Sequence, residues 1–151
     1  MAGNLDDVSG DIAGWASEYF SVREVRFGSW GDPAAIPRPV FLEMAKFAVK
    51  WTGYTHQWRR FRGLRFWLMA SVDTLVERDH ARRLGFRTFR VTKDPEQTKG
   101  ETQCPATRPG LEVTCRDCIL CNGVQESDEV HRRADITAPA HGRSAARFTG
   151  V

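Results

Sequence analysis

Four cysteines lie close together in the second half of the chain, and the sequence contains no others. They are Cys104, Cys115, Cys118 and Cys121. The last three are separated by two residues each, so a tight turn can bring their thiolates to one metal ion. Cys104 can then complete a tetrahedral set of four ligands. The sequence therefore predicts a metal centre in this stretch.

The spacing leaves the identity of the metal open. Four thiolates suit a structural Zn²⁺ ion, and they also suit a [4Fe–4S] cluster. Two overlapping Cys-x2-Cys steps are typical of ferredoxin-type clusters, whereas most zinc ribbons use two separated Cys-x2-Cys pairs. We expect Zn²⁺ first, with the cluster as the alternative and a pair of disulfides as the remaining reading.

A second group of polar side chains follows the predicted strands. Asp32, His56, Asp73 and Lys93 each lie at the end of a predicted strand or just beyond it. Ligands of α/β folds bind at the carboxyl ends of the strands, so parallel strands would gather these residues at one candidate catalytic rim. Each residue also has a structural explanation: Asp32 can form a turn with Pro33, and Asp73 can cap the following helix.

Positive charge is concentrated in the middle of the chain, although the net charge is only +3. Arg59, Arg60 and Arg62 alternate there with aromatic residues. This pattern suits phosphate contacts and base stacking on a nucleic acid, and it also suits a protein partner. The alternative is a solvated surface on which arginine side chains cover apolar groups.

Hydrophobic periodicity predicts the elements that must position these residues. Helices are expected over residues 5–20 and 40–51 and from Thr74 to Gly85, and strands over 23–30, 52–58, 65–72 and 87–92. Alternating helices and strands imply a parallel sheet, and about four strands are too few for a closed eight-stranded barrel. The expected class is α/β, as an open, partial parallel β/α barrel or a small α/β sheet with a C-terminal four-cysteine metal loop.

The 151 residues divide by composition into three parts. Residues 1–100 carry the periodic patterns of an α/β domain, and residues 101–123 form the metal-binding loop that we expect to pack on it. Residues 124–151 are polar, then small and basic, without a periodic apolar face. Such a composition predicts a flexible tail.

Several classes of protein are disfavoured. No apolar run approaches the ~18 residues of a membrane helix, and the acidic N-terminus does not resemble a signal peptide. We therefore expect a cytoplasmic location, where clustered cysteines favour a metal over disulfides. The absence of Gly-x-Gly-x-x-Gly, Gly-Lys-Ser/Thr, Gly-x-Ser-x-Gly and His-Glu-x-x-His disfavours common nucleotide-dependent enzymes, α/β hydrolases and zincins.

A series of motifs resembles a known group of proteins. The motifs lie at residues 26–37 (RFGSWGDPAAIP), 51–58 (WTGYTHQW), 69–74 (MASVDT), 89–92 (FRVT), 104–106 (CPA) and 115–123 (CRDCILCNG). Together they resemble an uncharacterised family encoded by bacteriophages and mobile elements, whose members are similar to a partial radical-SAM-like barrel. The resemblance implies a viral or mobile-element origin, and hence the cytoplasm of a host cell, but no activity.

This chain departs from the radical SAM pattern in one respect. Radical SAM enzymes hold their catalytic cluster on an N-terminal Cys-x3-Cys-x2-Cys motif, and this chain has no cysteine before residue 104. The resemblance therefore implies that the remaining cysteines form a structural or auxiliary site.

Three functions follow from these observations. The first is a phage-encoded, metal-binding accessory or interaction protein with a structural metal. The second is an enzyme, or an enzyme remnant, of radical-SAM-like fold that acts at the rim of Asp32, His56, Asp73 and Lys93. The third is a zinc-stabilised nucleic-acid-binding protein that uses Arg59, Arg60 and Arg62 together with the arginines of residues 78–90.

Overall fold

A six-stranded sheet forms the centre of the fold. The computed structural model describes residues 7, 9–93, 100–124 and 134–140. The strands are β1 (Glu24–Phe27), β2 (Lys50–Thr55), β3 (Met69–Val72), β4 (Thr88–Thr92), β5 (Glu101–Gln103) and β6 (Asp135–Pro139). They lie in the order β1-β2-β3-β4-β6-β5, and every neighbouring pair is parallel. The sheet is open, with β1 and β5 at its edges.

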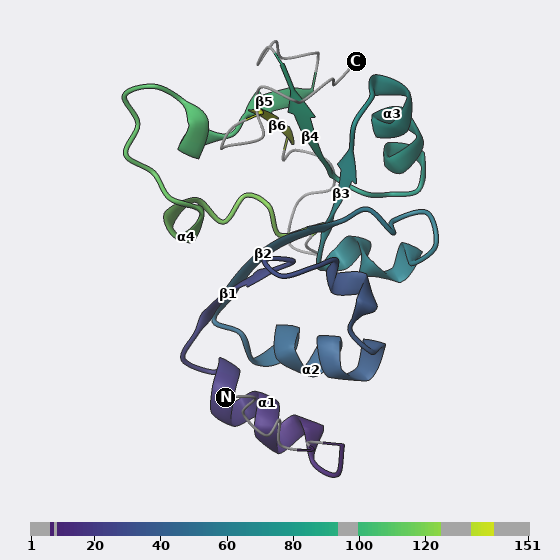
Figure 1. The fold of residues 1–151 in the computed structure, drawn as a ribbon, viewed down its shortest axis with the longest axis vertical. Helices are drawn as coiled ribbons and strands as arrows, with labels where there is room; N and C mark the ends of the chain where they lie inside the picture. The colour runs from purple at the N-terminus through teal and green to yellow at the C-terminus, as the bar shows by residue number, and fades with distance from the viewer. Residues whose placement is uncertain (1–6, 8, 94–99, 125–133, 141–151) are drawn as a thin grey trace.

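Helices cover one side of this sheet (Figure 1). α2 (Arg38–Phe47) and α3 (Leu75–Arg83) lie on that side, and α1 (Ile12–Phe20) packs against α2. The short helix α4 (Cys115–Cys118) lies on the other side, in the connection from β5 to β6. The connections also contain three 3-10 turns, η1 (Pro33–Ala35), η2 (Arg62–Phe66) and η3 (Pro105–Thr107).

Local signals set the ends of the helices. Asp11 caps α1, because its carboxylate accepts the backbone N–H of Gly14 at 2.8 Å. Thr74 caps α3 in the same way, accepting from Glu77 N at 3.1 Å. Gly85, with φ of +83°, ends the last turn of α3 in a conformation that glycine adopts without strain.

Two apolar clusters fill the space between the helices and the sheet. The first consists of Phe27, Phe41, Ala45, Leu64 and Leu68, and it joins α2 to β1. The second consists of Trp58, Ala70, Val72, Ala81 and Phe86, and it joins α3 to β3. Burial of these side chains is the main force that holds the helices on the sheet.

Charged side chains are buried at the other end of the sheet. Arg90 of β4 donates to the two carboxylate oxygens of Glu101 on β5 at 2.9 and 2.7 Å. Asp135 of β6 accepts from Thr88 N at 2.7 Å and from Arg82 Nε of α3 at 2.5 Å. Each buried charge therefore has a partner, as burial requires.

The α/β class and the open parallel sheet agree with the sequence prediction. The four predicted strands correspond to β1–β4, but residues 65–68 belong to η2 and the turn that follows it. The predicted helix over 40–51 is α2, which ends at Phe47 because β2 begins at Lys50. The predicted helix over 5–20 is α1 from Ile12 onward, because residues 9–10 form a turn and Asp11 caps the helix. Residues 5, 6 and 8 lie outside the described residues.

The largest difference concerns the predicted flexible tail. The prediction is wrong for residues 135–139, because they form β6 between β4 and β5, where four of the five residues are buried. Residues 125–133 and 141–151 of that tail lie outside the described residues. No helix in the described part of the chain is long and apolar enough to span a membrane.

Candidate metal centre

All four cysteines line one cavity of about 360 Å³, here called the cysteine cavity. It lies between the sheet and residues 104–123, here called the cysteine segment. Cys104 follows β5 directly, Cys115 and Cys118 belong to α4, and Cys121 follows α4. The four are free cysteines, without disulfides. The four cysteines that the spacing singled out thus share the lining of one cavity.

The sheet forms the floor of the cysteine cavity. The strand register places Arg26 beside Thr52 and Phe89 beside Ile136, so these side chains share the face opposite the helices. The rings of Tyr54 and Phe89 stack with their centroids 4.6 Å apart. Arg26 Nη2 donates to the hydroxyl of Tyr54 at 2.7 Å. The floor is thus mainly apolar and aromatic, with one guanidinium against it.

Backbone contacts fix Cys104 at the edge of the sheet. Its N–H donates to Thr137 O of β6 at 2.7 Å, which extends the β5–β6 pairing. Pro105 then opens η3, where its fixed φ suits the first position of a turn. Thr107 N closes that turn by donating to Cys104 O at 3.0 Å.

The short helix α4 carries the next two cysteines. Thr114 and Asp117 form a capping box at its start, in which Thr114 N donates to the Asp117 carboxylate at 3.1 Å. Ile119 ends the helix in the left-handed region with φ of +45°, which is uncommon for a β-branched residue. This reversal turns the chain so that Cys121 lines the same cavity as Cys115 and Cys118.

One buried guanidinium fastens the end of the cysteine segment. Arg87 Nη1 donates to the carbonyl oxygens of Leu120 at 2.8 Å and Gly123 at 3.2 Å. Its Nη2 donates to Ala134 O at 2.9 Å. Because Arg87 immediately precedes β4, these bonds join the cysteine segment and the start of β6 to the centre of the sheet. No local pattern in the sequence distinguishes Arg87 from the other arginines.

Close backbone approach fixes the same end. Gly53 N of β2 donates to Cys121 O at 2.7 Å. Gly123 has φ of +75°, and a Cβ at this position would lie 2.8 Å from backbone atoms of residues 65–68. Gly123 therefore provides the space in which the end of the cysteine segment meets residues 65–68, while Gly53 joins that end to β2 through its N–H.

The thiols differ in their exposure to water. Burial raises the pKa of Cys104, and it raises the pKa of Cys121 to about 12, with the neighbouring cysteines adding to both shifts. Cys115 is exposed. Without a cation the buried thiols are therefore neutral, and a bound metal would favour their thiolate forms.

The donor chemistry of the cavity fits a metal, but the side chains do not form a closed ligand shell. Four thiols are a complete set for Zn²⁺ or for a four-cysteine cluster. As the side chains stand, however, no group of three or more Cys, His, Asp or Glu in the described ranges could hold a metal ion. Ligation would therefore require the four thiols to lie closer to one another than they do here.

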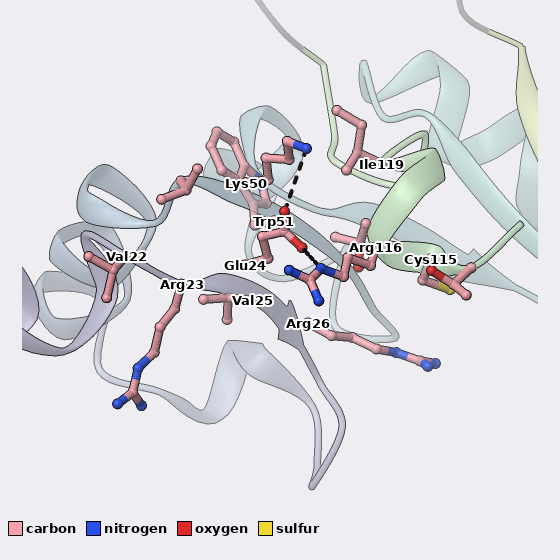
Figure 2. Close-up of a pocket in the computed structure, with 13 residues that line it drawn as sticks. Val22, Arg23, Glu24, Val25, Arg26, Lys50, Trp51, Cys115, Arg116 and Ile119 are labelled. Atoms are coloured by element: carbon pink, nitrogen blue, oxygen red, sulfur yellow. Dashed lines mark hydrogen bonds and ion pairs between the residues drawn. The ribbon is translucent and has the colours of Figure 1, made fainter.

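A second cavity of about 630 Å³ opens beside α4 at the β1 edge of the sheet, and Figure 2 shows its lining. The carboxylate of Glu24 lies there between two cations. Arg116 Nε donates to it at 2.6 Å, and Lys50 Nζ lies 3.5 Å from it. Arg23 and Arg26 extend away from this group in Figure 2. Glu24 thus links α4 to β1 and β2.

The structure brings two of the four predicted rim residues together. Asp32 Oδ2 accepts the N–H of His56 at 2.8 Å and lies 3.9 Å from its Nδ1. Asp32 Oδ1 accepts from Thr55 Oγ1 at 2.6 Å and from Ala34 N at 2.9 Å. These bonds cap η1 and join the loop after β1 to the end of β2. Asp32 therefore has a structural role in this loop.

The other two rim residues are exposed and stand apart from these contacts. Asp73 N donates to Glu77 Oε2 at 2.9 Å, and Thr74 caps α3 in place of Asp73. Lys93 follows β4 at the surface. Neither of the two cavities above is lined by a rim residue in the described part of the chain. A catalytic rim remains a prediction.

The three arginines of the predicted nucleic-acid surface separate into two groups. Arg59 pairs with Glu77 at 2.6 Å and stacks on Trp58, which is buried. Arg60 and Arg62 are exposed on the following turn. The sequence pattern therefore mixes one structural arginine with two that face solvent.

No family model, no curated protein and no solved structure matches this chain. The functional proposal therefore depends on the residues and contacts of the chain itself.

Proposed function

We propose that this chain is a metal-binding protein in which Cys104, Cys115, Cys118 and Cys121 ligate one centre. The observation that carries the proposal is that all four cysteines of the chain line the same cavity. They reach it from the end of a strand, from a helix and from the turn after that helix. In this proposal the open sheet is a partial β/α barrel, and the cysteine cavity lies on its inner face, opposite the helices.

The role of this centre is structural. A shell of four protein thiolates leaves no open position for a substrate or for water, whereas catalytic zinc sites keep one. Metal binding would instead stabilise the folded cysteine segment, because the unfolded chain does not hold a preformed site. The expected result is a segment fixed over the sheet, as in an accessory or interaction protein that presents a defined surface.

Zn²⁺ is the first expectation for the metal, and a [4Fe–4S] cluster is the alternative. The two are distinguished by analysis of protein that has been purified without oxygen. One zinc per chain in a colourless solution would support a zinc site. A brown solution that contains iron and sulfide would support the cluster. Four freely reactive thiols with neither metal would contradict the proposal.

Substitutions separate ligation from packing. Cys118→Ser should abolish stoichiometric metal and make the cysteine segment more sensitive to protease, because a serine hydroxyl is a poor ligand for either centre. Ala106→Ser is the matched control, because Ala106 is exposed at the same cavity and has no thiol. Its metal content should equal that of the parent. Equal loss of metal in both variants would mean that packing, and not thiolate ligation, determines metal content.

A further inference from the structure

A third cavity, of about 350 Å³, lies away from the cysteines, and we call it the arginine cavity. It is formed by η1 and the start of α2 on one side and by residues 60–64 on the other. Arg38, Arg60 and Arg62 all line it. Its remaining lining is apolar, and none of the residues described around it is a carboxylate.

The fold fixes the backbone that carries Arg60 and places Arg38 against the opposite wall. Trp58 is buried in the cluster under α3, and its Nε1 donates to Ser71 O at 3.0 Å. This anchor fixes the turn that follows, in which Arg60 N and Phe61 N both donate to Gln57 O at 3.0 Å. On the opposite wall, the guanidinium of Arg38 lies over Gly63, where an added Cβ would be 3.3 Å from Arg38 Nη2.

The charge of the arginine cavity is not balanced from within. Each of the three arginines is exposed, and no ion pair to any of them is recorded in the described ranges. Arg59 differs, because Glu77 neutralises it. Three guanidinium groups around one cavity repel each other, and an anion between them relieves that repulsion. Guanidinium groups also match phosphate oxygens in geometry.

An aromatic face accompanies the charge. Phe61 lines the arginine cavity and is 38% exposed, and Arg60 lies over its ring at 5.2 Å. Exposed rings beside unpaired arginines are the combination that binds single strands, because bases stack on the rings while the cations contact phosphates. The bases of a duplex are already stacked on each other and are not free to do this.

We infer that the arginine cavity binds single-stranded nucleic acid, with phosphates at Arg38, Arg60 and Arg62 and a base on Phe61. The inference is independent of the metal centre, because no cysteine lines this cavity. The proposed phosphate-binding set differs from the sequence prediction in one residue, because Arg38 and not Arg59 lines the cavity.

The test measures binding of a labelled single strand of about 12 nucleotides, a typical site size, by fluorescence anisotropy at increasing salt. Three phosphate contacts on a single strand predict that the affinity falls about 20-fold between 50 and 200 mM salt. Substitution of Arg38, Arg60 and Arg62 by Ala should weaken binding and lower the slope of log K against log salt by about 2. Phe61→Leu should weaken binding about fivefold or more without changing the slope.

The matched control removes the same charge elsewhere. Arg23, Arg83 and Arg108 lie outside the arginine cavity, and their triple substitution by Ala should leave the salt slope near that of the parent. An equal loss of slope in both triple variants would overturn the inference, as would the absence of salt-dependent binding at 50 mM salt. Tighter binding of a matched duplex, or equal competition by ATP or by poly-glutamate, would also overturn it. Urea unfolding of each variant confirms that it is folded.

Discussion

The helix-covered face of the sheet is held by two apolar clusters, while the opposite face is held by a few polar and backbone contacts. On the first face, side chains such as Phe41 and Ala81 are almost completely buried. On the second, Arg87, Gly53 and Gly123 fix a segment that has little regular structure. We therefore expect the cysteine segment to open without unfolding the helix-covered face, unless a metal holds it.

The largest expected loss of stability follows a substitution in the helix-covered face. Phe41 is 1% exposed, and its ring centroid lies 4.8 Å from that of Phe27. Phe41→Ala should lower the free energy of unfolding by about 3–5 kcal/mol, because it removes buried area and leaves a cavity. Urea unfolding followed by circular dichroism measures the loss. Phe61→Ala, at a half-exposed position, should cost less than about 1 kcal/mol, and equal losses would mean that α2 is not held by this cluster.

The next effect should be confined to the cysteine segment. Gly123→Ala places a Cβ against the backbone of residues 65–68 and forces a left-handed alanine, at a local cost of about 3 kcal/mol. The expected result is roughly a hundredfold faster labelling of Cys121 by a maleimide, with a smaller change in the urea midpoint.

Gly110→Ala is the control for this strain. Gly110 has φ of +80°, close to that of Gly123, but nothing lies within 4 Å of an added Cβ. It should therefore cost only about 1–2 kcal/mol and leave the labelling of Cys121 nearly unchanged. If the two variants label alike, the close approach at Gly123 does not hold the segment.

Particular residues explain what the sequence could predict. The ends of α3 were predictable, because Thr74, Glu77 and Gly85 are local capping signals. The segment from Asp135 to Pro139 resembles a turn, since Asp and Pro are rare within strands. It becomes β6 because Arg82 and Thr88 N satisfy Asp135, and both partners are distant in the chain.

The candidate site also contains residues that the sequence indicated and residues that it did not. Residue type and spacing alone singled out the four cysteines, and all four line the cysteine cavity. They form no group that could hold a metal ion in the described ranges, so ligation stays a prediction. Arg87 and Gly53 hold the segment only through contacts with residues more than thirty positions away, so no local pattern indicates them. The rim prediction assumed that aligned strand ends make one site, whereas the described contacts join Asp32 to His56 and leave Asp73 and Lys93 at the surface.

A smaller effect on the helix-covered face is the pH-dependent stability that Glu77 contributes. Bonds from Asp73 N and from the guanidinium of Arg59 lower the pKa of Glu77 below its ordinary value of 4.5. The bound carboxylate therefore contributes stability above the unfolded pKa, and this contribution disappears as the pH falls through the folded pKa. Glu77→Gln should cost less than about 1 kcal/mol at pH 7, because the pair is largely solvated.

Urea midpoints measured from pH 7 down to pH 3 check this sign. The difference between Glu77→Gln and the parent should shrink below pH 4.5. A difference that grows in acid would mean that Glu77 is held in its protonated form.

The smallest effect concerns the surface link between α4 and the sheet. Glu24→Gln removes the charge that Arg116 and Lys50 share, which should cost about 0.5 kcal/mol at low salt and almost nothing at 1 M salt. The labelling rate of Cys115 measures this loosening. A large effect that persists at high salt would show that the link does more than hold two surface charges.

The strand order has a consequence for how the chain assembles. β5 pairs with β6 and has no direct pairing with β4, yet it leaves the ribosome before β6. During synthesis β5 therefore has no strand to join until β6 has emerged. β6 then lies between β4 and β5, and the bridge of Arg90 and Glu101 spans it. A metal that gathered the cysteines during this interval would shorten the loop still to be closed, a saving below about 1 kcal/mol. A larger effect would concern the order of folding. The metal-bound cysteine segment would fold next to β5 before β6, the strand that pairs with β5, has been synthesised.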